Sequence, residues 1–108
     1  MDLRDRPVDL AVALTAAGAR MVVVGGVARR LRGSQHRPRD LDVVVAPADL
    51  PDLVDALRAL GVDAVTRSLL RSGCSRLETS YGLLDVFVGR APSAAPVLVA
   101  GVELPVAA

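Results

Sequence analysis

Residues 40–45, Asp-Leu-Asp-Val-Val-Val, place two acidic side chains in an apolar run that otherwise has the composition of a buried strand. Because successive side chains of a strand point to opposite faces, Asp40 and Asp42 share one face, and Leu41 lies on the other. The two carboxylates therefore stand side by side. Like charges this close raise each other's pKa unless a cation neutralises them, and ligation by oxygen alone suits Mg²⁺. The run predicts a strand with a divalent-metal site on one face.

An apolar run at 21–24 precedes this strand and ends at Gly25 and Gly26. Two glycines allow positive φ and let the backbone approach a ligand closely. The helix expected after them, near residues 27–32, would direct its free N–H groups and positive dipole end toward an anion such as a triphosphate. Taken alone, the pair fits a tight turn better than a phosphate site, but the acids downstream reverse this preference.

A third acid, Asp85, occupies a similar setting in the run 82–89. It shares its strand face with Leu83 and Phe87, so a simple pattern of polar residues outside and apolar residues inside does not explain it. Three strand acids can bracket one metal cluster.

This order of features resembles the nucleotidyltransferase superfamily, which has the fold of DNA polymerase β. The signature of that family is a hydrophobic residue, Gly-Gly or Gly-Ser, a spacer, and then Asp-hydrophobic-Asp. Here Val-Gly-Gly at 24–26 is followed by a spacer of thirteen residues, 27–39, and by Asp-Leu-Asp-Val at 40–43. The resemblance covers residues 21–88 and is closest to small bacterial members, some of which work in toxin–antitoxin pairs.

The resemblance implies an α+β nucleotidyltransferase fold, a small mixed β-sheet flanked by helices, as one minimal domain over 1–108. It implies transfer of a nucleoside monophosphate from a nucleoside triphosphate to an acceptor hydroxyl, with release of pyrophosphate. Asp40, Asp42 and Asp85 would be the catalytic and metal-binding residues, holding two Mg²⁺ ions, and Asp85 could also take the proton. The backbone at Gly25 and Gly26 would seat the β and γ phosphates.

Arginines supply all thirteen basic residues of the chain, so any basic phosphate ligand must be a guanidinium. Arg37 and Arg39 are favoured as nucleotide-binding residues because they adjoin the acids and because guanidinium binds phosphate in a bidentate manner. Arg29 and Arg32, on the expected helix, are further candidates, although most surface arginines are simply solvated. The small bacterial relatives often have Arg-x-Thr-x here, whereas this chain has a proline in place of the hydroxyl.

Other segments supply the scaffold. Apolar spacing predicts helices over 8–17 and from Pro47 to Gly61, which is expected to end the second one. Residues 62–66 read as a strand, 67–81 as two short β segments, and the tail as strand-like pieces around Gly101. Asp63 and Glu78 lack the motif spacing and are expected at the surface, and Tyr81 is expected at the rim of the site.

Composition limits the class of protein. With 108 residues, of which 52% are hydrophobic but only 2% aromatic, the chain forms one core of Val, Leu and Ala. A net charge of +1 argues against a broad nucleic-acid footprint. The single cysteine, Cys74, fits the reducing cytoplasm, and no apolar run reaches the roughly 18 residues of a membrane span.

The acceptor stays open among tRNA, protein and small molecules. Because relatives commonly continue into helices that complete the acceptor site, a helical partner protein or a homo-oligomer is a possible partner of this chain. The alternative to an enzyme is a catalytically inactive nucleotidyltransferase-fold binding module, acting as an antitoxin or assembly partner.

Overall fold

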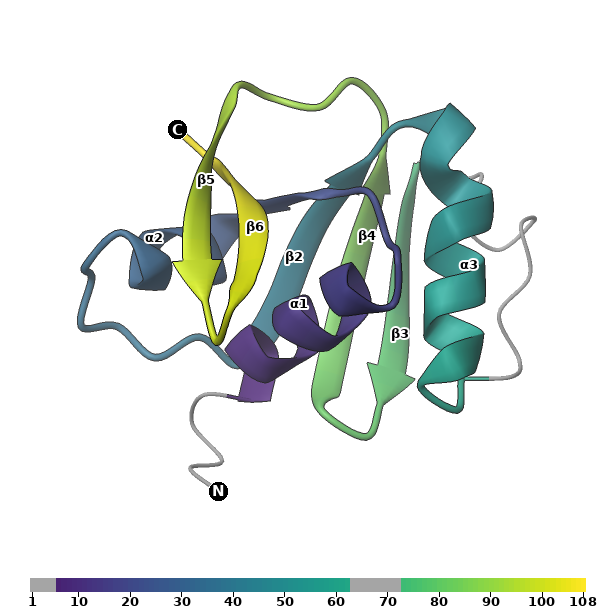
Figure 1. Cartoon of the computed structure of the whole chain (residues 1–108), viewed down its shortest axis with the longest axis horizontal. Coiled ribbons are helices and arrows are strands. Elements are labelled where there is room, and N and C mark those ends of the chain that lie inside the picture. The colour runs from purple at the N-terminus through teal and green to yellow at the C-terminus, as the bar shows by residue number, and fades with distance from the viewer. Residues whose placement is uncertain (1–5, 63–72) are drawn as a thin grey trace.

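A computed structural model describes residues 6–62 and 73–108 of the chain. One six-stranded sheet runs through it in the order β3-β4-β2-β1-β6-β5 (Figure 1). The strands are β1 (Val22–Val24), β2 (Asp40–Val45), β3 (Cys74–Thr79), β4 (Gly82–Val88), β5 (Ala94–Val99) and β6 (Val102–Ala107). The helices are α1 (Arg6–Ala16), α2 (Gly25–Leu31) and α3 (Leu50–Ala59), the last preceded by the 3-10 turn η2 (Pro47–Asp49).

The sheet is mixed. Strand β2 runs parallel to β4, and β1 runs parallel to β6, whereas the β1–β2, β3–β4 and β5–β6 pairs are antiparallel. The prediction of an α+β chain with a small mixed sheet and flanking helices is confirmed at this level.

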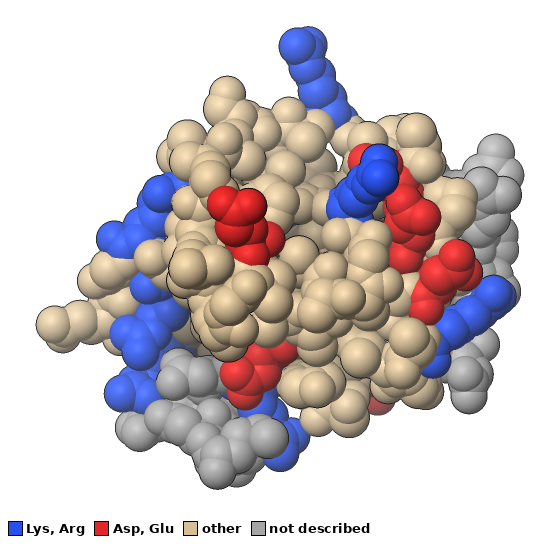
Figure 2. All heavy atoms as spheres, viewed as in Figure 1, with Lys and Arg blue, Asp and Glu red and all other residues tan. Residues whose placement is uncertain are grey.

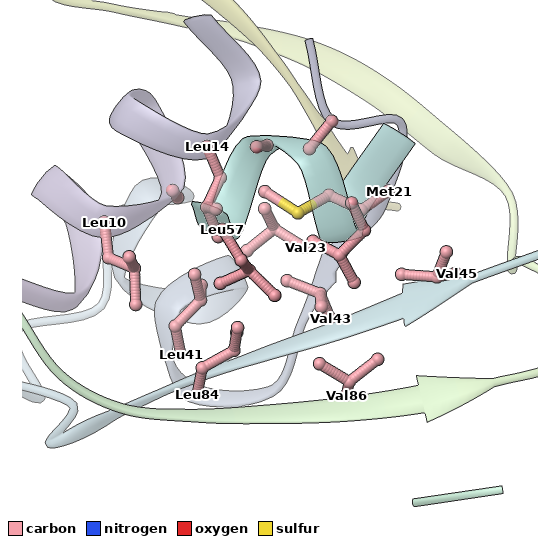
Figure 3. Packing of buried hydrophobic residues seen from close by; sticks show 14 of the residues in the cluster. Leu10, Leu14, Met21, Val23, Leu41, Val43, Val45, Leu57, Leu84 and Val86 are labelled. Carbon is pink, nitrogen blue, oxygen red and sulfur yellow. The ribbon is translucent and has the colours of Figure 1, made fainter. Parts of the chain in front are cut away.

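Successive side chains of β2 and β4 point to opposite faces of the sheet, so that one face is apolar and the other carries the acids. Leu41 lies beside Leu84 and Val43 beside Val86, and all four are fully buried. Figure 3 shows them packing against Leu10, Leu14 and Leu57 from the helices. Burying each such side chain contributes about 1.5–3 kcal/mol. Because the helices cover this face, the acids of β2 and β4 are left on the other.

Both predicted scaffold helices form. The first is α1, and the second begins with η2 at Pro47 and continues as α3, which buries Leu53 and Leu57 and leaves Asp55 and Arg58 exposed. Gly61 follows it with a φ of +87° and so ends the helix.

Of the remaining segments, one differs from its prediction, one lies mostly outside the described residues, and one matches its prediction. Helix α2 begins at Gly25, so the glycines form its first turn rather than a separate loop before it. The strand predicted at 62–66, most of the first β segment of 67–81 and Asp63 lie outside the described residues. The tail forms the predicted strand pair, a β5–β6 hairpin that turns at Ala100 and Gly101, both with positive φ.

Charged side chains are unevenly spread over the face that carries α1 and α3. Figure 2 shows acidic side chains and a few arginines on the side where α3 lies, and arginines along the opposite edge, where α2 and the loop after it lie. Among residues 6–62 and 73–108, no helix is both long and apolar enough to cross a membrane.

Candidate metal and phosphate site

The structure brings the three predicted acids together. Asp42 lies directly beside Asp85 in the parallel β2–β4 pair, and Asp40 is two residues away on the same face of β2. All three side chains are half-buried. They project from the sheet face opposite the core, so neither the helices nor the apolar cluster shields them from one another.

Asp42 and Asp85 lie within hydrogen-bonding reach of each other, and their pKa values move in opposite directions. Burial is the largest cause that raises the pKa of Asp42 to about 6, followed by the hydrogen bond with Asp85 and by repulsion from Asp85 and Asp40. The pKa of Asp85 is lowered, chiefly by its hydrogen bonds with Arg76. A proton taken up by this pair therefore resides on Asp42.

A cation from the chain itself, Arg76 on β3, lies between two of the acids. Its Nε donates to Asp85 Oδ1 at 2.8 Å, and its Nη2 donates to Asp85 Oδ2 at 3.0 Å and to Asp40 Oδ2 at 2.9 Å. The Arg76 side chain is 57% exposed, whereas that of Asp85 is only 13% exposed. These carboxylates raise the pKa of Arg76, which stays charged at any ordinary pH.

Arg76 was missing from the residues predicted for the site. A two-residue turn at Ser80 and Tyr81 places Thr79 opposite Gly82. Three residues further from the turn on each strand, Arg76 lies opposite Asp85. The sequence contains a signal for this turn, because a glycine, Gly82, directly follows the two turn residues. In the structure Gly82 has a φ of +109°.

The glycine pair lies against the acidic face. Gly25 has a φ of +65°, and a Cβ added there would overlap Asp42 Oδ2 and lie 3.3 Å from the Asp42 Cβ and Cγ. A Cβ on Gly26 would lie 3.1 Å from Pro38 Cβ. The positive φ and the contact with Asp42 thus favour glycine at Gly25 whether or not a phosphate binds there, whereas a side chain at Gly26 would require only a small shift of Pro38.

The predicted phosphate-binding arginines divide between two pockets. Arg37 and Arg39 line a pocket of about 470 Å³ together with Arg6 and Tyr81. Tyr81 is half-buried against the core, and its ring lies at this pocket rather than among the acids.

The second pocket, of about 390 Å³, adjoins the glycine turn, and Gly25, Arg29 and Arg32 are among its lining residues. Arg32 also donates to the carbonyl oxygens of Ala107 at 2.9 Å and Val106 at 3.0 Å. It therefore joins α2 to β6, a structural role that the sequence pattern did not predict.

The donor set suits a hard divalent cation, because three carboxylates share one face and one of them has a raised pKa. In the described part of the chain, however, no group of three or more His, Cys, Asp or Glu side chains is arranged to hold a metal ion. Asp40 and Asp85 instead accept hydrogen bonds from the guanidinium of Arg76. The residues fit the metal chemically, but not without rearrangement.

Comparison of the chain with protein-family models, with curated proteins and with solved structures gives no match. The chemistry of the site must therefore be inferred from its own residues.

Proposed function

We propose that this chain is a metal-dependent nucleotidyltransferase with a minimal nucleotidyltransferase fold. It would transfer a nucleoside monophosphate from a nucleoside triphosphate to an acceptor hydroxyl and release pyrophosphate. The observation that carries the proposal is the grouping of Asp40, Asp42 and Asp85 on one open sheet face, against the turn at Gly25. Such a group has no role in the core, and the pKa of Asp42 is raised, first by burial and then by its acidic neighbours, as is common at functional sites.

Asp40, Asp42 and Asp85 would hold two Mg²⁺ ions, which when bound stabilise the attacking and leaving oxygens of the displacement. The chain contributes the placement of these carboxylates, since the β2–β4 register fixes Asp42 beside Asp85. The pKa of Asp85 is lowered, so its carboxylate is ionised and, once released by Arg76, could accept the proton of the acceptor hydroxyl.

Two groups of arginines line pockets in which the triphosphate could bind. The pocket that adjoins Gly25 has Arg29 and Arg32 in its wall, and the pocket before β2 has Arg37 and Arg39. Both volumes fall within the roughly 300–1,000 Å³ of ligand pockets in proteins. We assign the phosphates to the backbone at Gly25 and Gly26. Arg37 and Arg39 would assist, because they lie in the loop just before the first acid.

The test is transfer of label from α-³²P nucleoside triphosphates, with Mg²⁺, to tRNA, to the protein itself and to small alcohols. Asp42→Asn keeps the shape of the side chain but removes its charge, and it is expected to abolish transfer. Asp55→Asn is the matched control, because Asp55 is exposed on α3 over the opposite sheet face. Transfer that persists in a folded Asp42→Asn protein would contradict the proposal.

A second candidate is a binding module without turnover, and Arg76 is the observation that favours it. Its guanidinium neutralises Asp40 and Asp85 without any metal, so the acids can be retained for structural reasons. Calorimetric titration with a non-hydrolysable triphosphate, with and without Mg²⁺, separates the two candidates. A module without catalysis should show no metal-dependent nucleotide affinity. The acceptor, the cytoplasmic location, and a helical partner or second copy stay predictions.

A further inference from the structure

We infer that Arg76 is a positioning residue that holds the acidic face in a metal-free arrangement and releases Asp40 and Asp85 when a divalent cation binds. This role rests on the proposed function, because only a metal-binding face requires the exchange. The structure provides three reasons for it: the hydrogen bonds that Arg76 makes, the exposure of its side chain at the surface, and the fixed place of its backbone in the sheet.

The hydrogen bonds use the oxygens that a cation would need. Arg76 engages both oxygens of Asp85 and one oxygen of Asp40, at 2.8–3.0 Å. A divalent ion bound by the same oxygens would lie within a few ångströms of the guanidinium, and like charges repel strongly at that distance. The guanidinium and the metal therefore compete for the same carboxylates.

Arg76 can leave without disturbing the fold. Its side chain is 57% exposed, and its backbone stays in the β3–β4 ladder opposite Asp85. Rotation about side-chain bonds alone moves the guanidinium into solvent, and the carboxylate oxygens that it leaves would then be bound by the cation. The same ladder keeps the freed side chain beside the site, from which it can return when the ion leaves.

The test is a Mn²⁺ titration without nucleotide, with free Mn²⁺ measured by electron paramagnetic resonance. Arg76→Ala is expected to bind Mn²⁺ about fivefold to tenfold more tightly than the wild-type chain, as the loss of a competing surface ion pair would produce. Arg58→Ala removes the same charge from α3, over the other sheet face, and is expected to leave the affinity unchanged.

The outcomes separate this role from the proposed function. Wild-type protein that binds Mn²⁺, with an Arg76→Ala variant that binds no more tightly, would overturn the role of Arg76 and leave the metal site standing. If neither protein binds Mn²⁺, the metal site itself is overturned, and the role of Arg76 with it. A purely structural ion pair predicts the opposite sign, weaker binding in the variant, because the acids would lose their placement.

A measurement on the wild-type chain covers the case in which Arg76→Ala does not fold. The Nε–Hε resonance of Arg76 is expected to shift in ¹H–¹⁵N spectra on saturation with Mg²⁺, because its bond to Asp85 Oδ1 is lost. A resonance that stays in place while Mg²⁺ binds would show that the ion and the guanidinium do not compete.

Discussion

The contact between Gly25 and Asp42 predicts a large stability loss for Gly25→Ala. The φ of +65° costs a residue with a Cβ about 1–2 kcal/mol. At pH 5, where Asp42 holds a proton, the new methyl group would also overlap Asp42 Oδ2 and force that carboxyl away from Asp85, at a cost of about 1 kcal/mol for the lost hydrogen bond. Reduced entropy of the unfolded chain returns about 0.4–1 kcal/mol. The net loss in the free energy of unfolding is therefore about 2 kcal/mol.

Urea denaturation followed by far-ultraviolet circular dichroism measures this loss. Gly101→Ala is the matched control, because Gly101 has a φ of +79° and nothing within 4 Å of an added Cβ. Gly101→Ala carries only the cost of the positive φ. Gly25→Ala should therefore be less stable than Gly101→Ala by about 1 kcal/mol, the value of the lost hydrogen bond between Asp42 and Asp85.

A double substitution isolates the contact itself. In an Asp42→Ala background the overlapping oxygen is absent, and the difference between Gly25→Ala and Gly101→Ala should largely disappear. Equal losses for the two glycine variants in the wild-type background would refute the contact between the turn and the acidic face.

Two further predictions concern charge and the last strand. Asp42 has a pKa of about 6 in the folded chain against 3.8 ordinarily, so the folded state holds an extra proton between these values and the fold loses stability as the pH rises through them. The full shift corresponds to roughly 3 kcal/mol, reduced by partial exposure, so Asp42→Asn should be about 1–2 kcal/mol more stable than wild type at neutral pH and should lose this gain near pH 4 in chemical denaturation. Arg32→Ala loses two hydrogen bonds to β6 and should cost about 1 kcal/mol, with faster amide hydrogen exchange in β6 but not in β4.

The face on which each acid lies could be predicted, because a strand has a period of two whatever its neighbours are. Asp40 and Asp42 had to lie on the same face of the strand, and the apolar residues that alternate with them had to lie on the buried face. The neighbour of β2 could not be predicted in the same way. Asp85 lies beside Asp42 only because β4 pairs with β2 in parallel and in one particular register, and no local pattern specifies that pairing.

The contacts that distinguish this site are those between distant segments. Arg76 on β3 reaches Asp40 on β2 across the one strand between them, β4, and Arg32 reaches the carbonyl oxygen of Ala107, at sequence separations of 36 and 75 residues. Periodicity describes one segment at a time, so it identified the acids but neither of these arginine roles. Likewise, the pattern led us to expect glycine at Gly25 for a ligand, whereas the positive φ and the contact with Asp42 already favour glycine without one.

The place of β1 has a consequence for synthesis on the ribosome. This short strand is central in the sheet, yet one of its two neighbours, β6, follows it by about eighty residues. A nascent chain that has already emerged through β4 can pair β1 with β2 but leaves the opposite edge of β1 without a partner, and such edges invite association with other chains. The time between translation of β4 and translation of β6 is thus the interval in which this protein is most exposed to misassembly.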